Sequence, residues 1–76
     1  MAMPRHPGTT ALLRWFDYDH LPPHFQAVSA PFHRLAHEVT VLLPDDDPEL
    51  TTGLRKILEA KDCIVRAAIR AREADG

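Results

Sequence analysis

The sequence lacks the covalent and metal cross-links that stabilise many short chains. It contains one cysteine, Cys63, which cannot form an internal disulfide and cannot by itself anchor a cysteine-rich zinc site. A chain of 76 residues buries too small a share of its surface to be more than marginally stable alone. We therefore expect self-association to supply the missing stability.

Long apolar runs and an excess of basic residues are absent as well. No apolar run approaches the roughly 18 residues of a membrane-spanning helix, and no charged-then-apolar leader begins the chain. These features and the unpaired cysteine predict a cytoplasmic protein that does not enter a membrane. The 9 Lys and Arg against 11 Asp and Glu give a formal net charge of -2. That charge does not provide the basic field that duplex nucleic acid requires, although a few local cations can still hold a small anion.

The first clear helical pattern lies in the middle of the chain. From Pro31 to Leu43 apolar residues recur at steps of three and four, which predicts a helix over about 31–43. Ser29 is a plausible N-cap, and proline is tolerated in the first helical turn. Residue 23 is an alternative start, because Pro23 also suits a first position, but a helix from there would have to kink at Pro31.

A second, longer apolar stripe runs from Leu50 to Ala68 and predicts a helix over about 48–73. Its start is marked by Asp47, whose side chain can cap the helix, and by Pro48, which fits the first helical position. A five-residue polar turn joins the two predicted helices, which is the connection length of antiparallel neighbours in small α folds. The sequence therefore predicts an all-α fold built on one antiparallel helical hairpin.

The N-terminal part of the chain shows no such periodicity. Residues 1–11 are rich in Pro, Gly and Thr, so we expect a flexible arm ahead of a single domain over 12–76. The segment from Leu12 to Tyr18 holds the only Trp and the only Tyr. We expect it to form a short extended or one-turn segment that docks on the hairpin.

Lys61 is an unusual residue for its position. It falls in the middle of the apolar stripe of the second predicted helix, between Ile57 and Ile64 on a helical wheel. Two interpretations stay open. Either the stem packs while the ammonium group reaches the edge or pairs with a carboxylate across an oligomer interface, or the charge is retained for an anionic ligand at an interface.

No catalytic constellation is evident in the sequence. His33 and His37 lie one helical turn apart, as two ligands of one metal would, but no HExxH motif and no obvious third ligand accompany them. Cys63 has no histidine near it in the sequence to act as a base. We therefore predict a binding protein without enzymatic activity, bound metal or cofactor. A metal-dependent enzyme using His33 and His37 is the least favoured interpretation.

The aromatic residues Trp15, Phe16 and Tyr18 stand just before His20. Aromatic faces beside a basic residue are suited to stacking on a nucleobase while cations meet its phosphate. The same residues can instead form an apolar plug over the open side of the hairpin. Both interpretations fit the sequence.

Two stretches of the chain resemble a known family. They are Phe16-Asp17-Tyr18-Asp19-His20-Leu21-Pro22-Pro23, followed by Gln26, and Leu54-Arg55-Lys56-Ile57-Leu58-Glu59-Ala60-Lys61, followed by Val65-Arg66-Ala67-Ala68-Ile69. Together they resemble the phage anti-CBASS cyclic-nucleotide sponges and the related hairpin of the Thoeris anti-defence sponges, over about residues 15–70. The resemblance implies a compact all-helical homo-oligomer, a hexamer in that family, that sequesters cyclic di- or trinucleotide immune signals without cleaving them.

The resemblance also implies roles for individual residues. Tyr18 corresponds to the family's base-stacking tyrosine, the phosphate-binding residue of the first helix to His33 or Arg34, and a basic residue of the second helix to Lys61 or Arg66. With the neighbouring aromatic and imidazole groups, the expected ligand-binding residues are Phe16, Tyr18, His20, His33, Arg34, Lys61 and Arg66. The alternative function is an oligomeric interaction protein that binds another protein through its aromatic segment.

Overall fold

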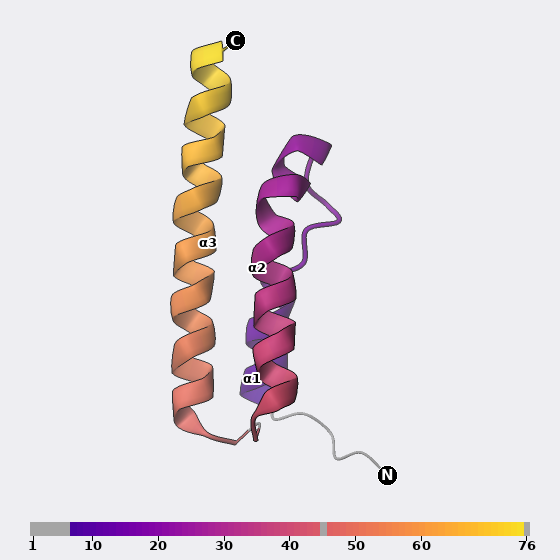
Figure 1. Ribbon diagram of the computed structural model, residues 1–76, viewed down its shortest axis with the longest axis vertical. Coiled ribbons are helices and arrows are strands. Elements are labelled where there is room, and N and C mark those ends of the chain that lie inside the picture. Colours follow the sequence, from indigo (N-terminus) through magenta and orange to yellow (C-terminus); the bar gives the residue numbers. More distant parts are fainter. Residues whose placement is uncertain (1–6, 45, 76) are drawn as a thin grey trace.

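The computed structural model describes residues 7–44 and 46–75, and this part of the chain contains three α-helices and no strand (Figure 1). The helices are α1 (Pro7–Arg14), α2 (Pro23–Leu42) and α3 (Pro48–Asp75). The predicted all-α class is therefore confirmed. None of these helices combines the length and the apolar composition that a bilayer-spanning helix requires.

The prediction of a flexible arm over residues 1–11 is wrong from Pro7 onward, because α1 begins at that residue. Proline suits the start of a helix, since its missing N–H would have no partner there. Thr9 and Leu13 are four residues apart, so they lie on one face of α1, and both are buried. Burial of that face stabilises a helix whose composition is typical of a loop. Residues 1–6 of the predicted arm lie outside the described residues.

Helix α2 begins at Pro23, the alternative start, and it continues through Pro31. Ser29 is therefore an interior, buried residue and not the predicted N-cap. Pro31 has no N–H to donate to the carbonyl of Ala27, which removes one hydrogen bond from the helix. Both residues are exposed, so water can reach that carbonyl.

Helix α3 starts where the sequence predicted, and it extends two residues beyond the predicted end at 73. The carboxylate of Asp47 accepts a hydrogen bond from the backbone N–H of Glu49 at 2.8 Å, which is the side-chain cap expected of an aspartate before the first turn. Pro48 occupies the first helical position.

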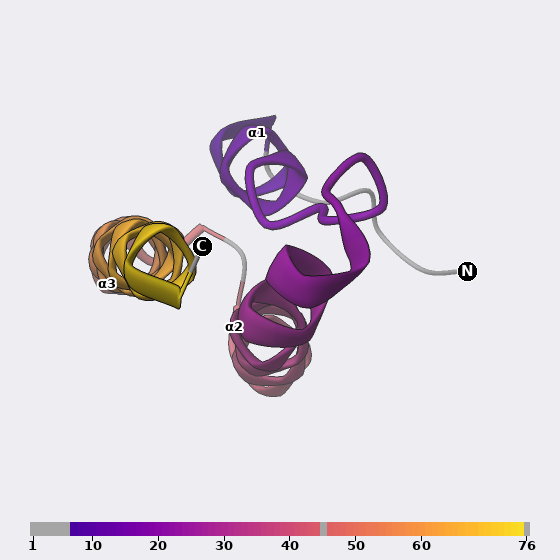
Figure 2. The same ribbon diagram turned by 90° about the horizontal axis from the view of Figure 1, so that it is seen from above.

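The three helices lie at the corners of a triangle when seen from above (Figure 2). Helices α2 and α3 run antiparallel, and α1 packs against both of them. The fully or nearly fully buried apolar residues come from all three helices and from the turn after α1; they are Leu13, Phe16, Ala36, Leu50 and Leu54. This core is small, and many large apolar side chains lie outside it and are exposed. Leu42, for example, is 76% exposed.

Candidate functional site

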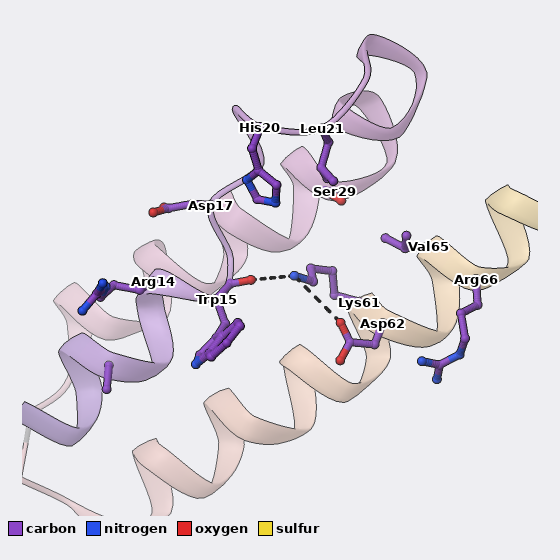
Figure 3. A pocket seen from close by; sticks show the side chains of 11 residues that line it. Arg14, Trp15, Asp17, His20, Leu21, Ser29, Lys61, Asp62, Val65 and Arg66 are labelled. Atoms are coloured by element: carbon purple, nitrogen blue, oxygen red, sulfur yellow. Dashed lines mark hydrogen bonds and ion pairs between the residues drawn. The ribbon is translucent and has the colours of Figure 1, made fainter.

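A hollow among the described residues lies between α3 on one side and the end of α1 with the segment that follows it on the other (Figure 3). Its volume is about 750 Å³, which is within the range of small-molecule sites in proteins. The hollow is open to solvent along one side. The residues that line it are Ala11, Arg14, Trp15, Asp17, His20, Leu21, Ser29, Lys61, Asp62, Val65 and Arg66. We refer to it as the α1–α3 pocket.

Lys61 lies at the centre of the α1–α3 pocket, and its ammonium group is bound within the chain. Its side chain is only 13% exposed, and Nζ lies 3.9 Å from a carboxylate oxygen of Asp62. The same nitrogen donates a hydrogen bond of 2.6 Å to the backbone carbonyl of Trp15 and lies 5.7 Å from the centre of the Phe16 ring. A cation is favourable there, because Trp15 directly follows α1, where the helix dipole is negative. This geometry supports the packed stem of the first interpretation, and the carboxylate that lies near the ammonium group is Asp62 of the same chain.

Trp15 and Phe16 are neighbours in sequence but face opposite environments. Trp15 is 68% exposed and lines the pocket, whereas Phe16 is completely buried in the core. The backbone N–H groups of both residues donate to carbonyls three residues earlier, which tightens the end of α1 and turns one ring out and the other in. The assignment of Phe16 as a ligand-binding residue is therefore corrected, because a fully buried ring has no face left for a ligand. Trp15 belonged to the aromatic cluster recognised in the sequence but was not among the expected ligand-binding residues.

Tyr18 and His33 come together outside the α1–α3 pocket. Their rings meet edge to face with centroids 5.2 Å apart, and the ring of His37 lies 4.3 Å from that of His33. His33 Nδ1 lies 3.3 Å from the backbone carbonyl of Phe16. Because a carbonyl only accepts, this hydrogen bond requires the proton on Nδ1. The structure thus brings together two of the expected ligand-binding residues in a second cluster, the Tyr18–His33 cluster.

The neighbouring candidate Arg34 is exposed on α2 and belongs to neither group. The three remaining candidates, His20, Lys61 and Arg66, all line the α1–α3 pocket. The expected ligand-binding residues are therefore divided among the core, the pocket and the Tyr18–His33 cluster, with Arg34 outside all three.

His20 belongs to a short loop that is fixed by a residue of α2. The side-chain amide of Gln26 donates to the backbone carbonyl of Leu21 at 2.7 Å and to that of Asp19 at 3.3 Å. These two carbonyls flank His20, so Gln26 holds the loop on both sides of the imidazole. Gln26 was part of the family resemblance, but its role was not evident from the sequence.

The pocket carries charges of both signs. Arg14, Lys61 and Arg66 contribute three cations, and Asp17 and Asp62 contribute two carboxylates. The two arginines are exposed, and Arg66 makes a contact of 3.4 Å to the sulfur of Cys63. Such a pocket is suited to a ligand that has an anionic part and also hydrogen-bond donors, with Trp15 offering an aromatic face.

One pocket residue, Ser29, has a polar atom that the fold leaves unused. Its hydroxyl is buried, and no hydrogen-bond partner for it lies within residues 7–44 and 46–75. Ser29 was predicted from the sequence only as a helix N-cap. In the same part of the chain, no group of three or more His, Cys, Asp or Glu side chains is arranged to hold a metal ion.

Comparisons with protein families, with curated proteins and with solved structures found no match to this chain.

Proposed function

We propose that this chain binds a cyclic di- or trinucleotide and sequesters it without cleaving it. The observation that carries the proposal is the α1–α3 pocket, whose lining includes the exposed indole of Trp15 and two exposed arginines, Arg14 and Arg66. An aromatic face stacks on a base of any sequence, and guanidinium groups make the strong, charge-assisted hydrogen bonds that phosphates accept. A pocket of about 750 Å³ has room for a ligand of this class.

In this proposal the residues have different tasks. Trp15 stacks on one base, and Arg14 and Arg66 bind phosphate, while His20 contacts the ligand from the loop that Gln26 fixes. Lys61 contributes mainly by holding the backbone of Trp15, because its ammonium group already has two partners in the chain. The Tyr18–His33 cluster provides a second aromatic surface, in line with the base-stacking role that the family resemblance gives to Tyr18.

We also propose that the chain works as a homo-oligomer, a hexamer if it follows the family it resembles, in the cytoplasm of a bacterial host. Helix α3 is longer than α2, and Ile64 and Ile69 in its C-terminal half are exposed. Exposed apolar rows of this kind are typical of interfaces. A second copy packed there would also close the open side of the pocket.

The experiment that tests the proposal is calorimetric titration of the purified protein with a panel of cyclic di- and trinucleotides. Light scattering establishes the oligomer size of each variant first. Arg66→Ala is expected to weaken binding by about 10- to 150-fold, the usual effect of losing a hydrogen bond to a charged group. Arg70→Ala is the matched control, because Arg70 lies one turn further along α3, is exposed and does not line the pocket.

Two further results belong to this test. The ligand must be recovered intact by chromatography after incubation, since sequestration involves no cleavage. Trp15→Ala and Tyr18→Ala, each at unchanged oligomer size, show which aromatic face stacks on the base. If a well-assembled wild type binds no member of the panel, the proposed function is wrong.

A second candidate function is binding to another protein. Consecutive apolar residues at the end of α2 are exposed, with Val41 at 70% and Leu42 at 76%. An apolar hollow of about 250 Å³ lies beside them and is lined in part by Leu43, Leu50 and Ile57. This function predicts that Leu42→Asp abolishes association with a partner protein and that no cyclic nucleotide binds to the wild type.

A further inference from the structure

A pocket made only to bind phosphate would not contain carboxylates, because they repel the ligand's charge. The α1–α3 pocket nevertheless holds Asp17 and Asp62. In Figure 3 the side chain of Asp17 is directed away from Lys61, whereas that of Asp62 is directed toward it. Asp62 is therefore the carboxylate that belongs to the interior of the pocket.

Asp62 lies close to a buried cation and is still accessible to a ligand. One of its oxygens lies 3.9 Å from Lys61 Nζ, and its side chain is 51% exposed. Lys61 is itself fixed by its hydrogen bond to the carbonyl of Trp15. The carboxylate of Asp62 is thus linked through Lys61 to the residue whose ring is the exposed aromatic face of the pocket, and Figure 3 shows the two side chains on either side of Lys61.

We infer that Asp62 recognises the hydrogen-bond donor edge of a base stacked in the pocket, and that the site selects guanine over adenine. The inference rests on the proposed function. Guanine presents two adjacent donors, N1–H and the N2 amino group, which match the two oxygens of one carboxylate. Adenine presents its N6 amino group beside the N1 lone pair, which repels a carboxylate oxygen. The favoured ligands are therefore cyclic di- or trinucleotides that contain guanine.

This selection also accounts for the mixture of charges in the pocket. The arginines meet the phosphates of the ligand, and the carboxylate meets the part of the ligand that carries only donors. A ligand without such donors would leave Asp62 partly desolvated without a hydrogen bond, which is unfavourable. Specificity then arises from a repulsive contact with adenine as well as an attractive contact with guanine.

The test compares three ligands on the wild-type protein by calorimetric titration: cyclic di-GMP, cyclic di-AMP and cyclic di-inosine monophosphate. Inosine keeps N1–H but lacks the N2 amino group, so the comparison isolates that donor without any substitution in the protein. We expect cyclic di-GMP to bind about 5- to 150-fold more tightly than cyclic di-AMP, with the inosine ligand between them.

The variant Asp62→Asn then removes the charge and keeps the shape. It is expected to lose most of the preference, because binding of cyclic di-GMP weakens while binding of cyclic di-AMP is unchanged or tighter. Glu59→Gln is the matched control, since Glu59 lies on α3, is exposed and does not line the pocket. Circular dichroism is used to check that both variants keep the helical content of the wild type.

The outcomes separate the two proposals. If the wild type binds all three ligands equally, or if Asp62→Asn weakens cyclic di-GMP and cyclic di-AMP to the same extent, the inference about Asp62 is wrong and the proposed function stands. If the wild type binds none of the three and no other cyclic nucleotide, both are wrong.

Discussion

Lys61 offers the sharpest test of how this small chain is stabilised. The substitution Lys61→Met keeps a straight apolar stem of similar length and removes the ammonium group. The carbonyl of Trp15 then loses its 2.6 Å hydrogen bond, and the ring of Phe16 loses a cation 5.7 Å from its centre. We expect the variant to be less stable, because the end of α1 is no longer tied to α3.

The magnitude follows from the two contacts. A hydrogen bond from a charged donor contributes about 1.5–3 kcal/mol, and the lower part of that range applies here, because the pocket is open and water can partly replace the lost donor. The apolar end of Met gains little in a pocket that admits water. We therefore expect a loss of about 1–2 kcal/mol in the free energy of unfolding, which corresponds to a decrease in Tm of about 4–16 °C for a domain of this size.

The assay is thermal unfolding followed by circular dichroism, at one protein concentration for all variants, because association would make Tm depend on concentration. Lys56→Met is the matched control: Lys56 is an exposed residue of the same helix and its loss changes the net charge equally. The control should stay within about 2–4 °C of the wild type. The reasoning is refuted if Lys61→Met unfolds at the same temperature as Lys56→Met.

Two further substitutions test the ends of the helices. Asp47→Ala removes the carboxylate that accepts a hydrogen bond from the N–H of Glu49. We expect the free energy of unfolding, measured with urea, to fall by about 1 kcal/mol. A stability equal to that of the wild type would contradict the capping role. Gln26→Leu removes both hydrogen bonds that hold the loop around His20. Hydrogen exchange at the amide of Leu21 should therefore become faster, while exchange in α3 stays unchanged. Equal protection of the Leu21 amide in variant and wild type would show that Gln26 does not fix the loop.

The sequence predicted the elements whose signals are local. The cap at Asp47, the proline that follows it and the long apolar stripe of α3 act within a few residues of one another, and the start of that helix was predicted correctly. Lys61 was also recognised as a polar residue within an apolar stripe, and its side chain is indeed largely buried. The start of the helix and the place of Lys61 in its stripe do not depend on distant parts of the chain, but the burial of Lys61 does, because its ammonium group binds the carbonyl of Trp15.

The predictions from sequence were incomplete or wrong for the features that tertiary packing determines. Helix α1 has the composition of a loop and is stabilised by the burial of Thr9 and Leu13 against the rest of the fold. Continuity of α2 through Pro31 required knowing that the proline faces solvent. The choice between Trp15 and Phe16 could not be made from hydrophobicity, because both rings are apolar and only the turn after α1 decides which one is buried.

The position of Lys61 links stability to the proposed function. Because its charge is used to hold Trp15, the cations left to meet phosphate are Arg14 and Arg66, and both are exposed. Exposed arginines lose side-chain entropy when a ligand immobilises them, so each contributes less than a group that is already fixed. In the proposed oligomer a second copy would restrict these side chains before the ligand arrives. Binding and assembly would then favour one another, and the apparent affinity for a cyclic nucleotide should rise with protein concentration until assembly is complete.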